Sequence, residues 1–453
     1  MTLDRPDTAA AAAQPLGPAH DGAQRRRATW SALLGTLVEY YDFYLYSLLA
    51  AVAIGPLFFP GSDPAAALLA SFATLAVGFV ARPIGAVLMA AVGDRLGRRN
   101  VLLITVLAMG VASLLIGLLP THATLGVWAP VLLVVLRVVQ GLAAGGEFGG
   151  GLLMSVEFAE RGRRGLASSA PQVGLYAGII LANGGLLLVS LLPREQFLGW
   201  GWRLPFFFSL VLVAVTLWVR AGVHETPVFE RARRRDDLAR RPLTDLFRTQ
   251  WRGLVTVVVV AFVVTTASAL NSSFIPAYAV RSGFGSSQAL TMTLIGTCTG
   301  LVLVPVFAAL SDRWGRRRLA LGGIVLVPVT AWVAFAVLGL GSFGWAVVAA
   351  VLPVAAHSMA FGPIGAWITE LFPTRFRYGG TSVGFQLAAT LGAGFFPLIA
   401  TALSTAAGGP PHYGLVLIYL VLAAIISVVG VLLTRETSTA TFDEIDATGT
   451  ETP

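Results

Sequence analysis

Twelve long apolar runs divide this chain, and each run is long enough to cross a lipid bilayer as one helix. The hydrocarbon core of a bilayer takes about 20 apolar residues of α-helix. Of the 453 residues 56% are hydrophobic and only 12% are charged, about half the charge of a soluble protein, which excludes a soluble enzyme. We therefore expect an all-α integral membrane protein with spans near 29–56, 65–92, 100–119, 129–155, 166–192, 201–220, 252–279, 289–310, 319–340, 344–371, 378–403 and 413–434.

An even number of spans places both termini on one side of the membrane. Apart from Arg82, Arg137 and Arg203, which fall within spans, only Arg194 and Arg281 lie on the opposite side. Arginine-rich loops stay in the cytoplasm. We therefore expect a multi-pass protein of the plasma membrane with both termini cytoplasmic, and the arginines are interpreted as topology signals, not as a nucleic-acid site.

The spans predict two six-helix bundles, 29–220 and 252–434, joined by an arginine-rich cytoplasmic linker over 221–251. The N-terminal tail 1–28 is expected to be disordered. The Thr-rich, acidic C-terminal tail 435–453 is expected to be solvated in the cytoplasm.

Two pairs of motifs recur at nearly the same offset. Residues 93–99 (GDRLGRR) follow the second span and 311–317 (SDRWGRR) follow the eighth, while Glu157 and Glu370 end the fourth and tenth. Such repeats indicate two homologous halves.

The repeated loop also predicts a cytoplasmic gate. Its glycine allows a tight turn, its aspartate can accept hydrogen bonds at a helix N-terminus, and its arginines can reach the carboxylates that end spans 4 and 10. These ties would break when the cytoplasmic side opens, although the loop arginines could instead serve topology alone. The predicted gate residues are Asp94, Arg95, Arg98, Glu157, Arg163, Asp312, Arg313, Arg316, Glu370 and Arg375.

The repeated Asp-Arg-x-Gly-Arg-Arg loop and the twelve spans resemble the major facilitator superfamily. Further segments are similar to the metabolite:proton symporter family, whose members import small organic acids such as 2-oxoglutarate, citrate and shikimate, or the osmolytes proline and betaine. The resemblance covers nearly the whole chain apart from the tails, and it departs at Ala90 and Ala308, where the family usually has glycine. The segments that carry it are 39–43 (EYYDF), 81–85 (ARPIG), 137–141 (RVVQG) with 145–147 (GGE), 201–206 (GWRLPF), 225–227 (ETP) and 370–375 (ELFPTR).

Charged side chains inside the first bundle are the proton-coupling candidates, because charge in a bilayer is costly and usually functional. Glu39 and Asp42 lie near the midplane and share one helix face, and two carboxylates so close disfavour double ionisation. The alternative is permanent pairing of both with arginines. The resemblance associates Arg137 with proton transfer, and the alternative is a structural pair with a carboxylate of the first span. Glu147 is interpreted as a proton site or a gate residue.

Arg82 is the best candidate to hold an anionic substrate, since it lies near the midplane and its guanidinium matches a carboxylate. A structural pair with Glu39 or Asp42 is the alternative. His357 is read as a buried structural residue or a proton relay. The other predicted substrate-binding residues are Tyr41, Tyr44, Arg203, Asn271, Tyr278 and Gln386.

These features predict a monomeric secondary transporter that imports a small organic acid with protons by alternating access. A zwitterionic osmolyte is the main alternative substrate, and sodium the alternative coupling ion. A sugar porter or drug exporter fits less well, and a polytopic enzyme or a non-transporting sensor is disfavoured. The chain has no nucleotide-binding loop, and with the single Cys298 it has no cysteine-based metal site. No cofactor or metal is expected.

Overall fold

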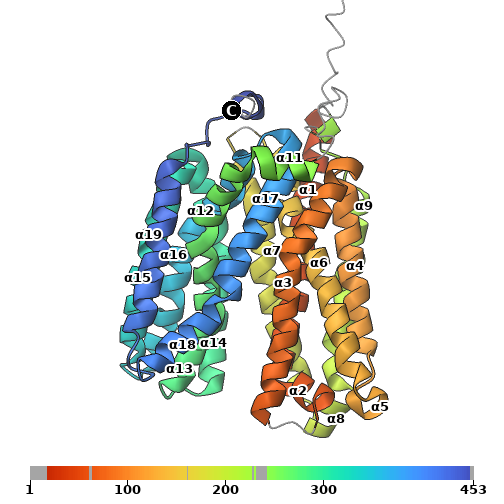
Figure 1. Cartoon of the computed structure of the whole chain (residues 1–453), viewed down its shortest axis with the longest axis vertical. Coiled ribbons are helices and arrows are strands. Elements are labelled where there is room, and N and C mark those ends of the chain that lie inside the picture. Colours follow the sequence, from red (N-terminus) through yellow and green to blue (C-terminus); the bar gives the residue numbers. More distant parts are fainter. Residues whose placement is uncertain (1–17, 61–63, 161, 227–228, 231–241, 449–453) are drawn as a thin grey trace, which may run out of the picture.

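Long helices make up almost all of the chain and form two bundles side by side (Figure 1). This computed structural model describes residues 18–60, 64–160, 162–226, 229–230 and 242–448, and these ranges contain no strand. Within these ranges eleven helices are long and apolar enough to cross a membrane, and the first span, which is bent by 51°, brings the number to twelve. The predicted all-α fold with two six-helix halves is confirmed.

The first bundle contains six spans. Its helix α3 is continuous from Pro64 to Leu96, although Pro83 lies inside it. The spans and their connectors are α1 (Pro18–Leu49) with η1 (Ala50–Ile54) and α2 (Gly55–Phe58), α3 (Pro64–Leu96), α4 (Arg98–Leu118), α5 (His122–Leu125), α6 (Trp128–Glu157), α7 (Arg164–Ser190), α8 (Arg194–Gly199), η2 (Gly201–Arg203) and α9 (Leu204–Ala221).

The second bundle repeats this arrangement, and the short gap between its third and fourth spans occurs where the sequence predicted it. Its helices are α12 (Trp251–Ala269) with η3 (Leu270–Phe274) and α13 (Ile275–Arg281), α14 (Ser286–Trp314), α15 (Arg316–Leu338), α16 (Phe343–Glu370), α17 (Thr374–Ala389) with η4 (Thr390–Gly394) and α18 (Phe396–Ala406), and α19 (Gly414–Leu433). Two short helices, α11 (Pro242–Thr249) and α20 (Phe442–Thr448), lie outside the bundles.

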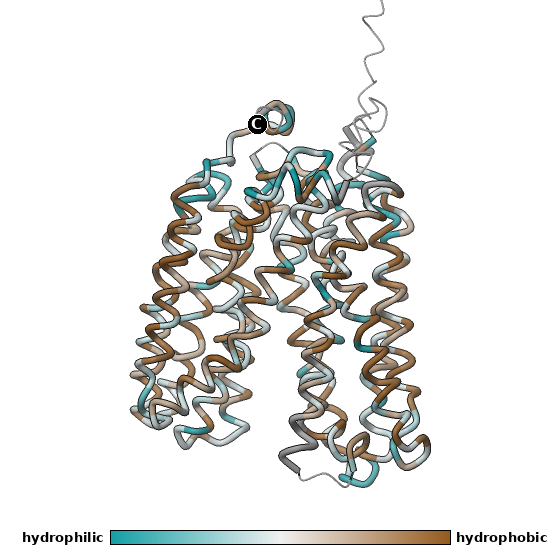
Figure 2. Tube along the Cα trace, in the orientation of Figure 1, coloured by the Kyte–Doolittle hydropathy of each residue, from teal (hydrophilic) through white to brown (hydrophobic). Residues whose placement is uncertain are grey.

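Both ends of the described chain lie at one end of the molecule, which we call the terminal face (Figure 1). The bundles meet near this face and diverge toward the opposite end, where α2 and α13 lie. Figure 2 shows hydrophobic residues along the length of the spans and more hydrophilic residues at the terminal face. The largest buried apolar cluster joins the two bundles, with Phe148 and Leu175 from the first and Phe361 and Phe385 from the second.

Both tails differ from expectation where the structure describes them. Residues 1–17 lie outside the described part, but α1 begins at Pro18, so the end of the predicted disordered tail extends the first span as helix. In the linker, 231–241 lie outside the described residues, and α11 packs its buried Leu246 near Gly379 of α17. The prediction of a solvated C-terminal tail is wrong: residues 436–446 bind both bundles, as described below.

Three spans contain a π-helical turn, at η1, η3 and η4. A proline follows each turn by two or three residues: Pro56, Pro276 and Pro397. Proline has no N–H and its ring clashes with the carbonyl one turn earlier, so the regular ladder is interrupted there. The turns of spans 1 and 7 lie 220 positions apart, which extends the internal repeat.

Close helix contact in the first bundle depends on glycine. At Gly145 of α6 a Cβ atom would overlap the Arg82 carbonyl oxygen and the Ala86 nitrogen of α3. The two backbones therefore touch beside Arg82, as small residues permit in membrane bundles.

We expect Gly145→Ala to lower the melting temperature of the detergent-solubilised protein by several degrees, because overpacking costs about 1–3 kcal/mol. Gly184→Ala on α7 is the matched control, since a Cβ atom there meets nothing within 4 Å. Both changes raise helix propensity by about 1 kcal/mol, so their difference isolates the contact. Equal melting temperatures for the two variants would contradict this packing.

Candidate functional site

A cavity of about 30 Å³ lies between the two bundles, near the middle of the spans that line it. The first bundle contributes Tyr44 and Tyr176, and the second contributes Asn271, Thr297 and His357. The π-helical turn η3 contains Asn271 and Ser272, so the proline-induced break places two polar side chains at the cavity wall.

Several polar atoms at this wall have no hydrogen-bond partner among the described residues. Both side-chain atoms of Asn271 and the Nε2 atom of His357 are buried without a hydrogen bond, while His357 Nδ1 lies 3.0 Å from the Tyr176 hydroxyl. Buried polar groups are almost always paired. Unpaired groups that line a cavity are therefore candidates to bind a polar ligand.

Arg82 and Glu39 form a buried ion pair with 3.0 Å between Nη1 and Oε1. The Arg82 guanidinium also lies 5.8 Å from the ring centre of Tyr40, and Tyr40 stacks on Tyr44 of the cavity wall at 6.4 Å. The pair is thus separated from the cavity by one layer of tyrosine. Of the two partners the sequence left open for Arg82, the structure pairs it with Glu39.

Asp42 and Arg137 are joined through two neutral side chains. Ser113 donates to the Asp42 carboxylate, Gln140 Nε2 donates to Ser113 at 2.7 Å, and Arg137 Nη1 donates to Gln140 at 2.7 Å. The Nε and Nη2 atoms of Arg137 have no hydrogen-bond partner within the described residues.

The rings of two aromatic residues hold the arginines in place. The Cζ atom of Arg82 lies 4.0 Å and that of Arg137 lies 4.6 Å from the centre of the Phe43 ring, and Arg137 also lies 3.9 Å from Tyr46. Cation–π contacts of this kind favour desolvated guanidinium groups. Phe43 therefore couples the positions of the two buried arginines.

Glu147 lies in a separate site nearer the terminal face. It is fully buried, forms an ion pair with Arg220 of α9 and accepts a hydrogen bond from Thr105 at 2.6 Å. Sequence reasoning missed Arg220, which resembled one more arginine at the end of a span.

The other predicted substrate-binding residues lie away from the cavity lining. Tyr41 donates to the Pro205 carbonyl at 2.8 Å, and Arg203 donates to Gly117 and Leu119 carbonyls at the end of α4. Tyr278 is buried among aromatic rings of the second bundle, and Gln386 donates across the bundles to the Ala144 carbonyl at 3.4 Å.

A layer of contacts between the bundles closes the cavity toward the terminal face. Phe148 of α6 stacks between Phe361 and Phe385, with ring centres 6.4 and 4.3 Å away. Gln172 donates to the Phe361 carbonyl at 2.6 Å, and Tyr378 donates to the Gly146 carbonyl at 2.9 Å. Solvent at this face is therefore separated from the cavity by packed side chains of both bundles.

Ion pairs extend this closure on the first-half loop. Arg98 lies 3.0 Å from Glu157, and Arg377 of α17 lies 3.5 Å from the same carboxylate. Arg98 also donates to the Thr374 carbonyl of the second bundle at 3.5 Å. The loop turns at Gly97, whose φ of 91° favours glycine. The side chains of Asp94 and Arg95 lie outside the described part of the structure.

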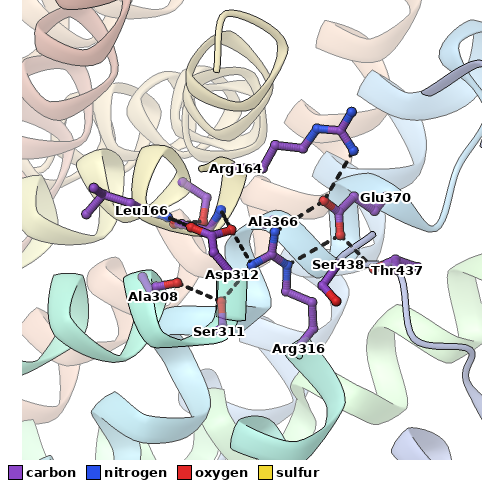
Figure 3. Close-up of polar contacts among 12 residues, drawn as sticks. Arg164, Leu166, Ala308, Ser311, Asp312, Arg316, Ala366, Glu370, Thr437 and Ser438 are labelled. Carbon is purple, nitrogen blue, oxygen red and sulfur yellow. Dashed lines mark hydrogen bonds and ion pairs between the residues drawn. The ribbon is translucent and has the colours of Figure 1, made fainter. Parts of the chain in front are cut away.

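The second-half loop ties the bundles more directly (Figure 3). Asp312 accepts hydrogen bonds from the backbone N–H groups of Gly165 at 2.8 Å and Leu166 at 3.0 Å, at the N-terminus of α7. Arg316 lies 2.7 Å from Asp312 and 3.5 Å from Glu370.

The remaining predicted gate residues lie close by. Arg164, at the start of α7, was not among the predicted gate residues, yet it reaches Glu370 across the bundle interface at 3.6 Å. Arg163 lies 3.8 Å from the exposed Glu160, Arg375 lies over the Phe376 ring at 4.9 Å, and Arg313 is exposed beside Trp314.

The C-terminal segment 436–446 folds over this loop network. Asp446 accepts from the N–H and hydroxyl of Thr374 at 2.6 and 2.7 Å, and Thr437 donates to Glu370 at 2.6 Å. The guanidinium of Arg164 lies 3.8 Å and that of Arg377 lies 4.2 Å from the centre of the Phe442 ring. Because one arginine belongs to each bundle, the segment bridges them.

Two glutamates missed by the sequence reasoning cap the helices that follow the repeated loop. Glu225 accepts from the Arg99 N–H at 3.3 Å, and Glu436 accepts from the Arg316 N–H at 2.9 Å. Both are followed by threonine, 211 positions apart, so the repeat itself held this signal. Within the described residues no group of three or more His, Cys, Asp or Glu side chains could hold a metal ion.

Comparison with known proteins agrees with this architecture. The family model described as "Sugar (and other) transporter" matches residues 28–251 and 241–448. The inner membrane metabolite transport protein YhjE of Escherichia coli K12 is 40% identical over 423 residues, covering 91% of this chain and 94% of that protein. The shikimate transporter of the same organism is 38% identical, with coverages of 92% and 96%, and its proline/betaine transporter is 32% identical, with 84% and 78%.

Solved structures share the fold. The proton:xylose symporter XylE bound to 6-bromo-6-deoxy-D-glucose aligns with a TM-score of 0.78 at 18% identity, covering 94% of this chain and 99% of that one. FucP in the outward conformation aligns with a TM-score of 0.66 at 14% identity, covering 90% and 99%. The chain therefore belongs to the sugar (and other) transporter family of the major facilitator superfamily, and it is a multi-pass membrane transporter of small molecules.

Proposed function

We propose that this transporter imports a small organic acid together with a proton by alternating access. The observation that carries the proposal is the buried Glu39–Arg82 pair, one tyrosine layer from a cavity. Within the described part of the chain, the Asn271 amide and His357 Nε2 at that cavity have no hydrogen-bond partner. A carboxylate substrate needs a cation and polar donors, and this site supplies both.

Coupling follows from competition for Arg82. While Glu39 is ionised it neutralises the guanidinium, and a substrate anion gains little there. Protonation of Glu39 leaves Arg82 without its counter-charge, and a substrate carboxylate can replace Glu39 as the partner. The proton then resides on Glu39 and the substrate on Arg82, so neither is stable in the site without the other.

The terminal face is the cytoplasmic side by the distribution of arginines. The structure is closed there by the loop network, so the state described is one that meets substrate from outside. Inward opening requires the Asp312, Glu157 and Glu370 contacts between the bundles to separate. Binding of the proton and the substrate would favour the state in which the opposite end of the molecule is closed and the terminal face is open.

A zwitterionic osmolyte is the second candidate substrate. The Glu39–Arg82 pair presents both signs of charge, which suits an ammonium and a carboxylate on one molecule. Relatives named for each class match this chain, the shikimate transporter and the proline/betaine transporter. The acid is favoured because the residues that line the cavity include no carboxylate to bind an ammonium group, while Arg82 lies one tyrosine layer away.

Uptake into proteoliposomes with an acidic exterior tests the substrate class and the role of Arg82. We expect one acid among shikimate, citrate and 2-oxoglutarate to accumulate, and Arg82→Gln to reduce its uptake by about 10- to 100-fold, because a charged hydrogen bond is worth about 1.5–3 kcal/mol. The exposed Arg194→Gln is the charge-matched control. Uptake of proline or betaine alone would replace the acid by the osmolyte, and full activity of Arg82→Gln would remove Arg82 from the site.

Glu39→Gln separates proton coupling from substrate binding. The amide mimics a protonated carboxyl, so we expect exchange of internal for external substrate to persist while the response to a pH gradient disappears. Glu195→Gln, at an exposed position of α8, should keep the gradient response. An unchanged pH response in Glu39→Gln would assign the proton to another group, with Asp42 the first alternative.

The C-terminal segment gives a conformational prediction. Asp446→Asn should weaken the contact with Thr374 and Arg377 and populate the state open at the terminal face. Spin labels at Leu96→Cys and Arg252→Cys, in a Cys298→Ser background, would then report a larger fraction of long distances. Asp443→Asn changes an exposed carboxylate of the same helix and should leave the distribution unchanged; the same distribution in both variants would contradict a bridging role.

A further inference from the structure

A hollow of about 550 Å³ opens on the terminal face at the junction of α14 and α15, away from the cavity between the bundles. Three arginines and an exposed tryptophan line it, and Trp314 is 58% exposed. The lining residues include Arg313, Trp314, Arg317, Arg318, Leu321 and Glu436.

The hollow is strongly positive. Its single carboxylate, Glu436, accepts hydrogen bonds from the backbone N–H groups of Arg316, Arg317 and Ser438 at 2.9 to 3.0 Å. Burial opposes ionisation of Glu436, but these three donors outweigh it and hold its pKa below the ordinary value. Among the described residues no ion pair joins Glu436 to Arg313 or Arg318, so their guanidinium groups are left to face the hollow.

Comparison of the two repeated loops separates the residues that both halves share from those present in the second-half loop alone. The equivalent loop of the first half makes the same turn at Gly97 and the same helix cap, but it has Leu96 where the second half has Trp314 and Asn100 where the second half has Arg318. The tryptophan and the extra arginine are thus additions to the shared gate structure.

An apolar stripe continues from the hollow along α15. Leu321 lines the hollow, and Val325, Val329 and Trp332 follow at helical spacing, each about half exposed. From Arg318 to Trp332 the helix rises about 21 Å at 1.5 Å per residue, more than one leaflet of hydrocarbon, roughly 15 Å. A soluble anion would make no contact with this apolar stripe, whereas the acyl chains of a lipid would pack along it.

We propose that the hollow binds the phosphate headgroup of an anionic membrane lipid, with Arg313, Arg317 and Arg318 around the phosphate and the acyl chains along the exposed stripe of α15. Basic pockets on the cytoplasmic side of membrane proteins bind such headgroups, and tryptophan favours the headgroup level. The lipid would sit against the helix whose first N–H groups Glu436 caps, and so next to the C-terminal segment that bridges the bundles.

Native mass spectrometry of the full chain with phosphatidylglycerol or phosphatidylcholine tests this site. We expect phosphatidylglycerol to be retained over phosphatidylcholine, and the double variant Trp314→Leu/Arg318→Asn to lower that retention about fivefold or more. The variant carries the residues of the first-half loop at exposed positions, so folding is preserved; melting temperature checks this. Arg248→Asn, on the exposed surface of α11, removes one charge from the same face and should retain the lipid.

Each other outcome overturns the proposal. Equal retention of phosphatidylcholine would mean that the headgroup is not recognised. Unchanged retention by both the double variant and Arg313→Gln would place the lipid elsewhere. Displacement of the lipid by sn-glycerol 3-phosphate at matched concentration would make the hollow a site for a soluble phosphate, because the headgroup alone would then account for binding.

Discussion

A guanidinium group surrounded by apolar helices needs a counter-charge or a polarisable ring. The free-energy cost of burying an uncompensated charge is larger than the stabilisation that a single contact provides. This constraint organises the first bundle. Arg82 pairs with Glu39, Arg220 pairs with Glu147, and Arg137 is held by rings and a chain of neutral donors. Where such a pair lies near a cavity, protonation of the carboxylate removes the counter-charge of the arginine, and a substrate anion can take its place.

At the terminal face, aspartate side chains bind the N-termini of α7 and α17. In the second half Asp312 binds the first N–H groups of α7. At the pseudo-equivalent start of α17, Asp446 of the C-terminal helix binds Thr374. Closure of the terminal face therefore depends in part on the C-terminal segment, which lies outside the two bundles. The proposed lipid hollow lies next to this segment, and so close to the interface that would move.

Several site predictions depended on choices that the residues alone left open. The spacing of Glu39 and Asp42 predicted that they share a helix face, yet the structure gives them separate partners, Arg82 for one and Ser113 for the other. Arg220 was missed because an arginine at the end of a span has the same sequence signal whether it faces lipid headgroups or a buried carboxylate. Asn271 lines the cavity through a π-helical turn, which residue type alone does not reveal.

The sequence by itself determined the number of spans, the two homologous halves, the loop turns at Gly97 and Gly315, and the family. These follow from hydropathy, glycine conformation and motif spacing, which are properties of short stretches of chain. Only the tertiary structure decided which charges pair, that the C-terminal segment binds Arg164 and Arg377, and that Asn271 and His357 Nε2 have no hydrogen-bond partner among the described residues at one cavity. Those outcomes depend on distances between helices that lie a hundred or more residues apart, and such distances are set by packing.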